Sequence, residues 1–177
     1  MSGQQRLPVE VDPYRMAELG RQYSGQIEIG SMKRLLPLLE SAKGQVDVEL
    51  HFDIDETGTK YLQGYLRADL ELMCQRCLES MEFPLNTEFR LALIKSDSEA
   101  ERLSGTYEPL VVETTPLYIQ DVLEDEILLS LPTIPMHEPG ACSIQPLMKQ
   151  TELAEQHDEE TEKTNPFAVL EKLKKDH

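Results

Sequence analysis

Residues 46–55 read VDVELHFDID, in which every second residue is apolar and those between are acidic or histidine. Successive side chains of a β-strand point to opposite faces, so this alternation predicts a half-buried strand with one apolar face. Two further runs follow with the same period, and their buried faces are expected to hold Leu66, Ala68, Leu70, Leu72 and Cys74, then Met81, Phe83, Leu85, Thr87, Phe89, Leu91 and Leu93. Short turns join the three runs. The sequence therefore predicts an antiparallel β-meander that curls into a partial barrel.

Helices are predicted to flank this meander. One should begin at Asp12 with Pro13 in the favoured first position, and another should be capped by Ser31 and kinked or ended by Pro37. A third is predicted within residues 117–132, where apolar side chains recur at helical spacing. Short strands are expected at 7–11, 26–29 and 107–113. The fold class is therefore α+β.

The chain is expected to contain a single globular α+β domain, residues 1–148, because 177 residues suffice for one core but rarely for two. Residues 149–164 follow as an acidic, disordered linker, since six acidic residues and no basic one occur between Glu152 and Glu162. Residues 165–177 are predicted to form a short amphipathic C-terminal helix, with Phe167, Leu170 and Leu173 on one face.

The formal net charge of −16 limits the classes of partner. A field of this sign repels the phosphate backbone, so nonspecific binding to DNA is not expected. No apolar run approaches the roughly 18–20 residues that a membrane span needs, and no secretory signal is recognisable, so we expect a cytoplasmic protein without a membrane partner. Residues 103–148 hold seven acidic residues and neither Lys nor Arg, which favours a basic protein as partner.

Two pairs of metal-ligand residues stand about sixty residues apart. Cys74 and Cys77 form a Cys-x-x-Cys at an expected hairpin turn, and His137 and Cys142 lie in the proline-rich segment 132–146. Together they predict a closed set of three cysteines and one histidine, which is typical of structural zinc and would hold the irregular loop on the sheet. Two alternatives stay open: the cysteines are ordinary core residues, or Cys74 and Cys77 form a redox pair, although redox motifs belong at a helix N-terminus.

An enzyme is not expected. The sequence contains none of the patterns GxxxxGK[ST], GxGxxG, GxSxG or HExxH, so the common nucleotide-binding and hydrolase sites have no counterpart. The carboxylates Asp121, Glu124, Asp125 and Glu126 are interpreted as a solvated helix face.

Four motifs in order resemble the YceD family of large ribosomal RNA subunit accumulation proteins. They are Cys74-Gln75-Arg76-Cys77, the acidic helix from Val122 to Pro132, the loop Ile134-Pro135-Met136-His137 with Cys142, and the segment Asn165 to Leu170. The resemblance implies a noncatalytic ribosome biogenesis factor that supports the synthesis, processing or stability of large-subunit rRNA. Many members carry cysteines in the second half of the chain, where this sequence has His137 and only one cysteine, Cys142.

Two ways of acting are compatible with this resemblance. In the first, Arg67, Arg76 and Arg90, with Tyr61 and Tyr65 nearby, contact the large-subunit rRNA directly. In the second, which the net charge favours, the chain binds a basic ribosomal protein or other assembly partner. The residues predicted for that contact are Glu108, Glu113, Asp121, Glu124, Asp125, Phe167 and Leu170. The alternative functions are an acidic adaptor that regulates an RNA-processing enzyme or other partner, and a zinc-dependent RNA hydrolase.

Overall fold

A computed structural model describes residues 7–143 of the chain. The chain divides into two compact units, Met1–Met136 and His137–His177, and every helix and strand named below lies in the first. The linker predicted for residues 149–164 and the helix predicted for residues 165–177 lie outside the described residues.

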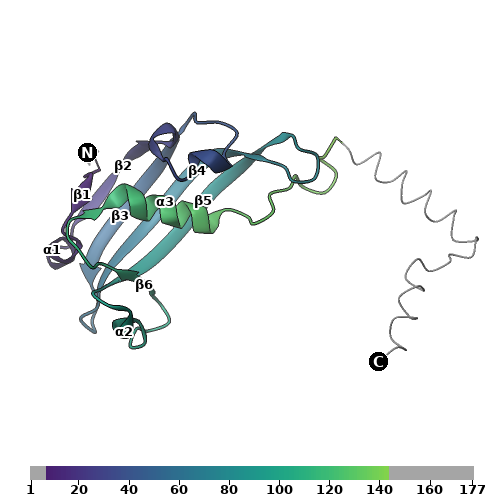
Figure 1. Ribbon diagram of the computed structural model, residues 1–177. Coiled ribbons are helices and arrows are strands. Elements are labelled where there is room, and N and C mark those ends of the chain that lie inside the picture. Colours follow the sequence, from purple (N-terminus) through teal and green to yellow (C-terminus); the bar gives the residue numbers. More distant parts are fainter. Residues whose placement is uncertain (1–6, 144–177) are drawn as a thin grey trace, which may run out of the picture. The chain divides into compact units, whose positions relative to one another are not determined.

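Five strands form the main sheet, in the order β2-β3-β4-β5-β6 (Figure 1). They span Gln22–Glu28 (β2), Gln45–Ile54 (β3), Lys60–Met73 (β4), Ser80–Ile94 (β5) and Glu108–Val111 (β6). Strands β2 to β5 pair antiparallel in chain order, which confirms the predicted meander. The longest pairing joins β4 to β5, from Tyr61 opposite Ala92 to Met73 opposite Ser80.

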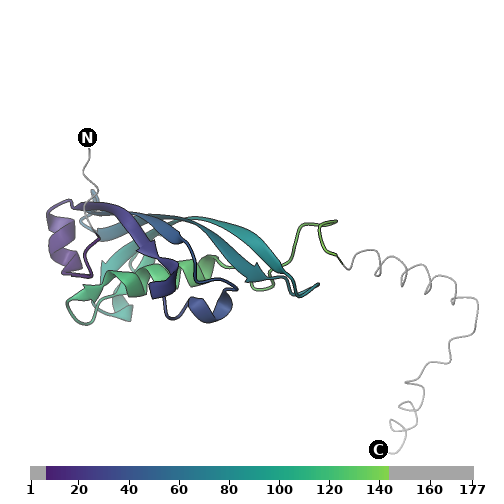
Figure 2. The same cartoon turned by 90° about the horizontal axis from the view of Figure 1, so that it is seen from above.

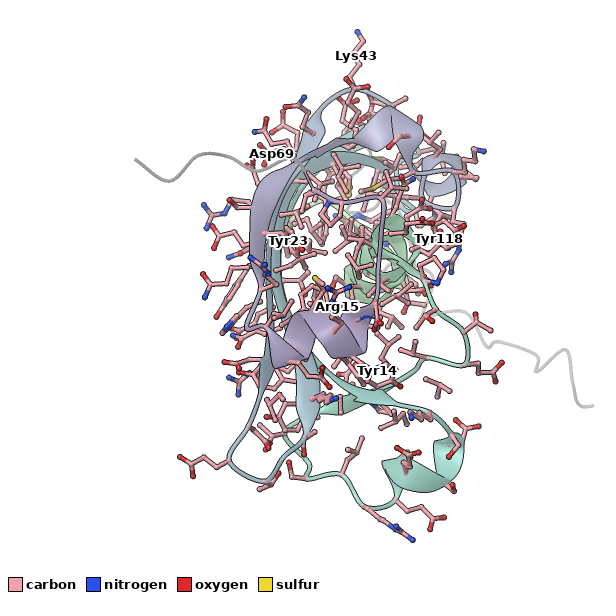
Figure 3. The ribbon with its side chains drawn as sticks, turned by 90° about the vertical axis from the view of Figure 1, so that its left-hand side faces the viewer. Tyr14, Arg15, Tyr23, Lys43, Asp69 and Tyr118 are labelled. Carbon is pink, nitrogen blue, oxygen red and sulfur yellow. The ribbon has the colours of Figure 1, made fainter. Side chains whose placement is uncertain are left out.

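The sheet is curved and open, and the described residues form no closed barrel (Figure 3). Strand β6 pairs parallel to β5, so the sheet is mixed rather than purely antiparallel. A parallel neighbour requires a crossover, and the chain makes it through residues 95–107, which contain helix α2 (Asp97–Ala100). The predicted α+β class is confirmed, and the meander is extended by one parallel edge strand.

Helix α3 (Ile119–Ser130) lies along the concave face of the sheet (Figure 2). Its buried residues join the inward side chains of the strands in one hydrophobic core, as the predicted spacing requires. The largest fully buried side chains include Phe52, Leu62, Leu66, Leu123 and Ile127. Figure 3 shows the same division of faces: Tyr23 points inside the curve, whereas Asp69 lies outside it.

The N-terminal segment closes one end of this core. Helix α1 (Pro13–Glu18) begins as predicted, with the carboxylate of Asp12 accepting a hydrogen bond from the Arg15 N–H at 3.1 Å. Strand β1 (Glu10–Val11) pairs antiparallel with β7 (Leu117–Tyr118) in a second, two-stranded sheet. Within residues 7–143, no helix is both long and apolar enough to cross a membrane.

The helix predicted from Ser31 onward is wrong. This segment contains only two 3-10 turns, Ile29–Ser31 (η1) and Leu36–Leu38 (η2). Pro37 has no N–H to donate, and in an α-helix its ring would clash with the carbonyl four residues earlier, so an α-helix cannot propagate through the segment. Met32 and Leu35 are instead buried singly in the core.

Candidate functional site

The Cys-x-x-Cys motif forms the turn between β4 and β5. The Cys74 N–H donates to the Glu79 carbonyl at 2.9 Å, and the Leu78 N–H donates back to the Cys74 carbonyl at 2.8 Å. Cys74 is fully buried, whereas Cys77 is half-buried. The turn therefore sits at a hairpin tip and not at a helix N-terminus, which is the position that a thioredoxin-like pair would need.

Leu78, directly after the second cysteine, has a φ of +60°. A residue with a Cβ is disfavoured in this left-handed region by about 1–2 kcal/mol. The side chain is also 69% exposed, so burial does not offset this cost. The hairpin thus accepts backbone strain next to Cys77, which is typical of functional turns.

Replacing Leu78 with glycine is expected to raise the free energy of unfolding by roughly 0.5–1 kcal/mol, because relief of the strain outweighs the entropy of the added glycine. Urea unfolding measures this change. The matched control is Leu129→Gly, since Leu129 is 75% exposed on helix α3. This variant should lower the free energy of unfolding by about 1 kcal/mol, because glycine is a poor helix former. An equal loss in both variants would show that Leu78 is unstrained.

The second ligand pair lies close in sequence and in space. The Ala141 N–H donates to the Glu138 carbonyl at 3.0 Å, and Gly140 takes the positive φ of 100° that the turn requires. This turn brings Cys142 Sγ to 3.7 Å from His137 Nδ1. Ahead of this pair, the Pro135 carbonyl accepts a hydrogen bond from the Gln75 N–H at 2.8 Å, so the first unit holds its own end beside Cys74.

The ligand atoms of Cys74, Cys77, His137 and Cys142 lie within 4.8 Å of one another. In a tetrahedral zinc site, sulfur and nitrogen ligands are about 3.6 Å apart and two sulfurs about 3.8 Å apart, as follows from Zn–S and Zn–N bonds of roughly 2.3 and 2.0 Å. The 3.7 Å between Cys142 Sγ and His137 Nδ1 agrees with this geometry. The donor set of three cysteines and one histidine thus fits zinc.

The predicted RNA-contacting arginines do not form one patch. Arg67 and Arg90 are exposed on the convex side of the sheet, and Arg76 lies beyond the end of β4 in the hairpin turn. Arg90 pairs across the strands with Gln63, four residues and so roughly 13 Å along β4 from Arg67. Its guanidinium donates to Gln63 Oε1 at 3.1 and 3.2 Å and lies 5.9 Å from the centre of the Tyr61 ring.

The residues predicted to contact a protein partner differ in exposure. Glu108, Glu113, Asp121 and Asp125 are exposed, and Asp125 forms an ion pair with Arg34. Glu124 is only 3% exposed and accepts hydrogen bonds from the Arg34 N–H at 2.7 Å and from Gln120 Nε2 at 3.0 Å. Glu124 therefore holds the segment around Arg34 on helix α3, and its carboxylate is buried rather than exposed at the surface. Phe167 and Leu170 lie outside the described residues.

Glu126, on the same helix, has an unusual carboxyl group. Burial, followed by the nearby charges of Glu108 and Asp125, raises the pKa of Glu126 to about 7. Between pH 4.5, the ordinary pKa of a glutamate, and about pH 7, the folded state therefore keeps a proton that the unfolded state has lost. The stabilisation from this proton is fully present below about pH 4.5 and is lost as the pH rises through about 7.

The variant Glu126→Gln is accordingly expected to be more stable than the natural chain by roughly 2 kcal/mol at pH 8, and nearly equal to it at pH 4.5, after allowing for partial solvent screening. Urea unfolding at the two pH values measures the difference. The exposed Glu101→Gln is the control and should show no such pH dependence. A gain of equal size at both pH values would mean that folding does not change the pKa of Glu126 and that the gain has another cause.

The convex side of the sheet also carries a feature that the sequence reading missed. A hollow of about 480 Å³ crosses strands β2 to β5 there, and its lining includes Ser24, Gln26, Asp47, Glu49, Tyr65 and Arg67. The alternation of residues 46–55 indicated that Asp47 and Glu49 share a face. Which residues of β2 lie beside Asp47 and Glu49 depends on the register between β2 and β3, and no local pattern of the sequence determines this register.

Comparison with known proteins identifies the family. The profile described as "Large ribosomal RNA subunit accumulation protein YceD" matches residues 62–174. A relative with the same description, from Haemophilus influenzae, is 30% identical over 170 residues, which cover 96% of this chain and 97% of the relative. No solved structure matches the chain. The resemblance read from the four motifs is confirmed, and the chain belongs to the YceD family.

Proposed function

We propose that this protein supports the accumulation of large-subunit ribosomal RNA, without catalysing a reaction, by binding a basic protein partner. Family membership supports the role in accumulation, because the profile and the Haemophilus influenzae relative are both described as large ribosomal RNA subunit accumulation proteins. The two names describe no mode of action, and the charges and geometry of the chain support a protein partner.

A protein-mediated mode of action is supported by the arrangement of charge. The chain carries a net charge of −16, and Arg67 and Arg90 stand among exposed carboxylates on the convex side of the sheet. These include Asp47, Glu49, Asp69, Glu71, Glu82 and Glu88. A protein that binds RNA directly must neutralise several phosphates at once, and two separated arginines among six acids do not supply such a field. The same carboxylates attract a partner rich in Lys or Arg.

The four ligands Cys74, Cys77, His137 and Cys142 are proposed to hold a structural zinc ion. Three thiolates and one imidazole would complete a tetrahedral shell, with no position left for water. Zinc would supply the free energy that keeps the proline-rich segment after Leu131 on the hairpin. A closed shell also counts against the zinc-dependent RNA hydrolase, because hydrolysis requires an exchangeable water on the metal.

The test is complementation of a Haemophilus influenzae strain that lacks its own relative. Plasmid-borne chain should restore the ratio of large-subunit to small-subunit rRNA, and the tagged chain should sediment with large-subunit precursors. Crosslinks to a basic protein rather than to rRNA are expected in those fractions. Recovery only in free fractions, with one nuclease as partner, would replace the proposal by the adaptor function. Discrete rRNA crosslinks at Arg67 to Arg76 would establish direct RNA contact instead.

A further inference from the structure

The edge of the main sheet at β2 is open among the described residues. Strand β2 pairs only with β3, and it contains neither Pro nor Lys, which natural edge strands commonly use to prevent pairing with other chains. The opposite edge, β6, is different. It is only four residues long and contains Pro109, which cannot donate to a further strand.

The direction of the backbone groups on β2 follows from the hydrogen bonds at its two ends. The Arg21 carbonyl accepts from the Phe52 N–H at 2.9 Å, and the Ile29 N–H donates to the Gly44 carbonyl at 3.2 Å. In an antiparallel pair the residues alternate, so the odd-numbered residues of β2 face β3. The N–H and C=O groups of Gln22, Ser24 and Gln26 therefore point out of the sheet.

At the Glu28 end of β2, an outward backbone group already has a partner, which agrees with the assignment of even-numbered residues to the outer edge. The outward carbonyl of Glu28 accepts a hydrogen bond from the Ser31 hydroxyl at 2.8 Å. No described residue engages the outward backbone groups of Gln22, Ser24 and Gln26. The open part, called here the β2 edge, is thus the stretch from Gln22 to Gln26, which suffices for pairing with one short strand.

Acidic side chains stand directly behind the β2 edge. The register places Ser24 opposite Glu49 and Gln26 opposite Asp47, and Gln26 Nε2 donates to the Asp47 carboxylate at 2.7 Å. The hollow of about 480 Å³ extends to this edge, where the small residues Ser24 and Gly25 of β2 line it. A long basic side chain on a neighbouring strand can cross these small residues to the carboxylates of β3, two strand spacings or roughly 9–10 Å away.

We propose that the β2 edge binds an extended, lysine- or arginine-rich segment of a protein partner as a sixth strand of the sheet. Backbone hydrogen bonds to Gln22, Ser24 and Gln26 supply the affinity, and Asp47 and Glu49 select basic side chains at alternate positions of the added strand. The inference rests on the proposed protein-mediated function, because it names the surface and the chemistry of that partner. Charge complementarity favours this occupant over RNA, and over a second copy of a chain with charge −16.

The test uses a synthetic peptide of twelve residues in which Thr and Lys alternate. A control peptide has the same composition but six Thr followed by six Lys, so its charge is equal while its lysines cannot all lie on one face of a strand. The alternating peptide is expected to bind about tenfold more tightly, and to slow hydrogen exchange at the Gln22, Ser24 and Gln26 amides. Equal binding of the two peptides would overturn the proposal, because attraction by net charge alone would then explain the result.

Ser24→Pro removes the outward N–H without touching the ladder to β3, and it should weaken binding of the alternating peptide about tenfold while leaving the melting temperature unchanged. Ser24→Thr keeps the N–H and should bind normally. Undiminished binding by Ser24→Pro overturns the proposal. Concentration-dependent self-association that Ser24→Pro abolishes would also overturn it, and would assign the edge to a second copy. Tighter binding of a single-stranded RNA twelve-mer than of either peptide would assign it to RNA.

Complementation separates this proposal from the function on which it rests. The Haemophilus influenzae strain without its relative should regain large-subunit rRNA with Ser24→Thr but not with Ser24→Pro. Full restoration by Ser24→Pro would reject the β2 edge and leave the proposed function standing. An unchanged rRNA ratio in the deletion strain itself would reject the proposed function, whereas the peptide measurements would still decide what the edge binds.

Discussion

Replacing Gly64 with alanine is expected to lower the free energy of unfolding by about 3 kcal/mol. Gly64 lies on the inward face of β4, opposite Phe89 of β5. A Cβ at this position would stand 2.1 Å from Cζ of the Phe89 ring and 2.6 Å from Cε1, far inside van der Waals contact. Phe89 is itself buried in the core, so the ring cannot move aside without displacing its neighbours.

Two further variants show whether the clash is the cause. Gly105→Ala introduces the same methyl group where no atom lies within 4 Å, and it should change stability by less than about 0.5 kcal/mol. Phe89→Leu shortens the side chain, so its cost should be partly recovered when it is combined with Gly64→Ala. Chemical unfolding of the natural chain, the three single variants and the double variant measures both effects. Strictly additive losses would show that Gly64 is needed for a reason other than the Phe89 ring.

The main sheet could be predicted because its signal is local. In β3, β4 and β5 the period of two runs through ten or more residues, and one face of each strand is buried, so the pattern determines which side chains enter the core. Helix α3 could be predicted for the same reason, since Ile119, Leu123 and Ile127 recur at helical spacing and are all buried. Periodicity of this kind reports burial directly.

Other features depend on contacts between distant residues, which periodicity does not carry. The segment around Arg34 has apolar residues that suggest a helix, yet its conformation is determined by Pro37 and by hydrogen bonding to Glu124, ninety residues later. Likewise, Glu124 lies in a run of acids that reads as a solvated face, but the helix buries this carboxylate and partly buries that of Glu126. The parallel pairing of β6 with β5 could not be predicted either, since the direction of β6 follows from the path of the crossover through residues 95–107.

The candidate metal site was accessible to sequence reading because ligand chemistry restricts spacing. A Cys-x-x-Cys at a hairpin brings two sulfurs to one side, and His137 and Cys142 are separated by a turn of matching size. The β2 edge was not accessible in this way. Its significance comes from which backbone groups face outward, and this depends on the alignment of β2 with β3 rather than on the identity of Gln22, Ser24 or Gln26.

Removing the proposed zinc ligand Cys74 is expected to lower the free energy of unfolding, measured in the presence of zinc, by about 3 kcal/mol. A ligand that binds only the folded state stabilises it by roughly 2.7 kcal/mol when its free concentration is a hundred times the dissociation constant. Cys74→Ser should therefore abolish stoichiometric zinc, measured by elemental analysis, and lower the melting temperature. The proline-rich segment that begins at Pro132 should exchange its amide hydrogens faster, since the ion no longer holds it on the hairpin.

A chelator distinguishes a metal ligand from an ordinary core cysteine. Cys74 is fully buried, so serine at this position costs stability even without zinc. If zinc is bound, chelation should lower the melting temperature of the natural chain and leave Cys74→Ser unmoved. His137→Cys offers the matched control, because a set of four cysteines still binds zinc, whereas His137→Ala should lose the ion. A natural chain indifferent to chelation would show that the three cysteines and His137 are packing residues, and the hairpin would then owe its geometry to its hydrogen bonds alone.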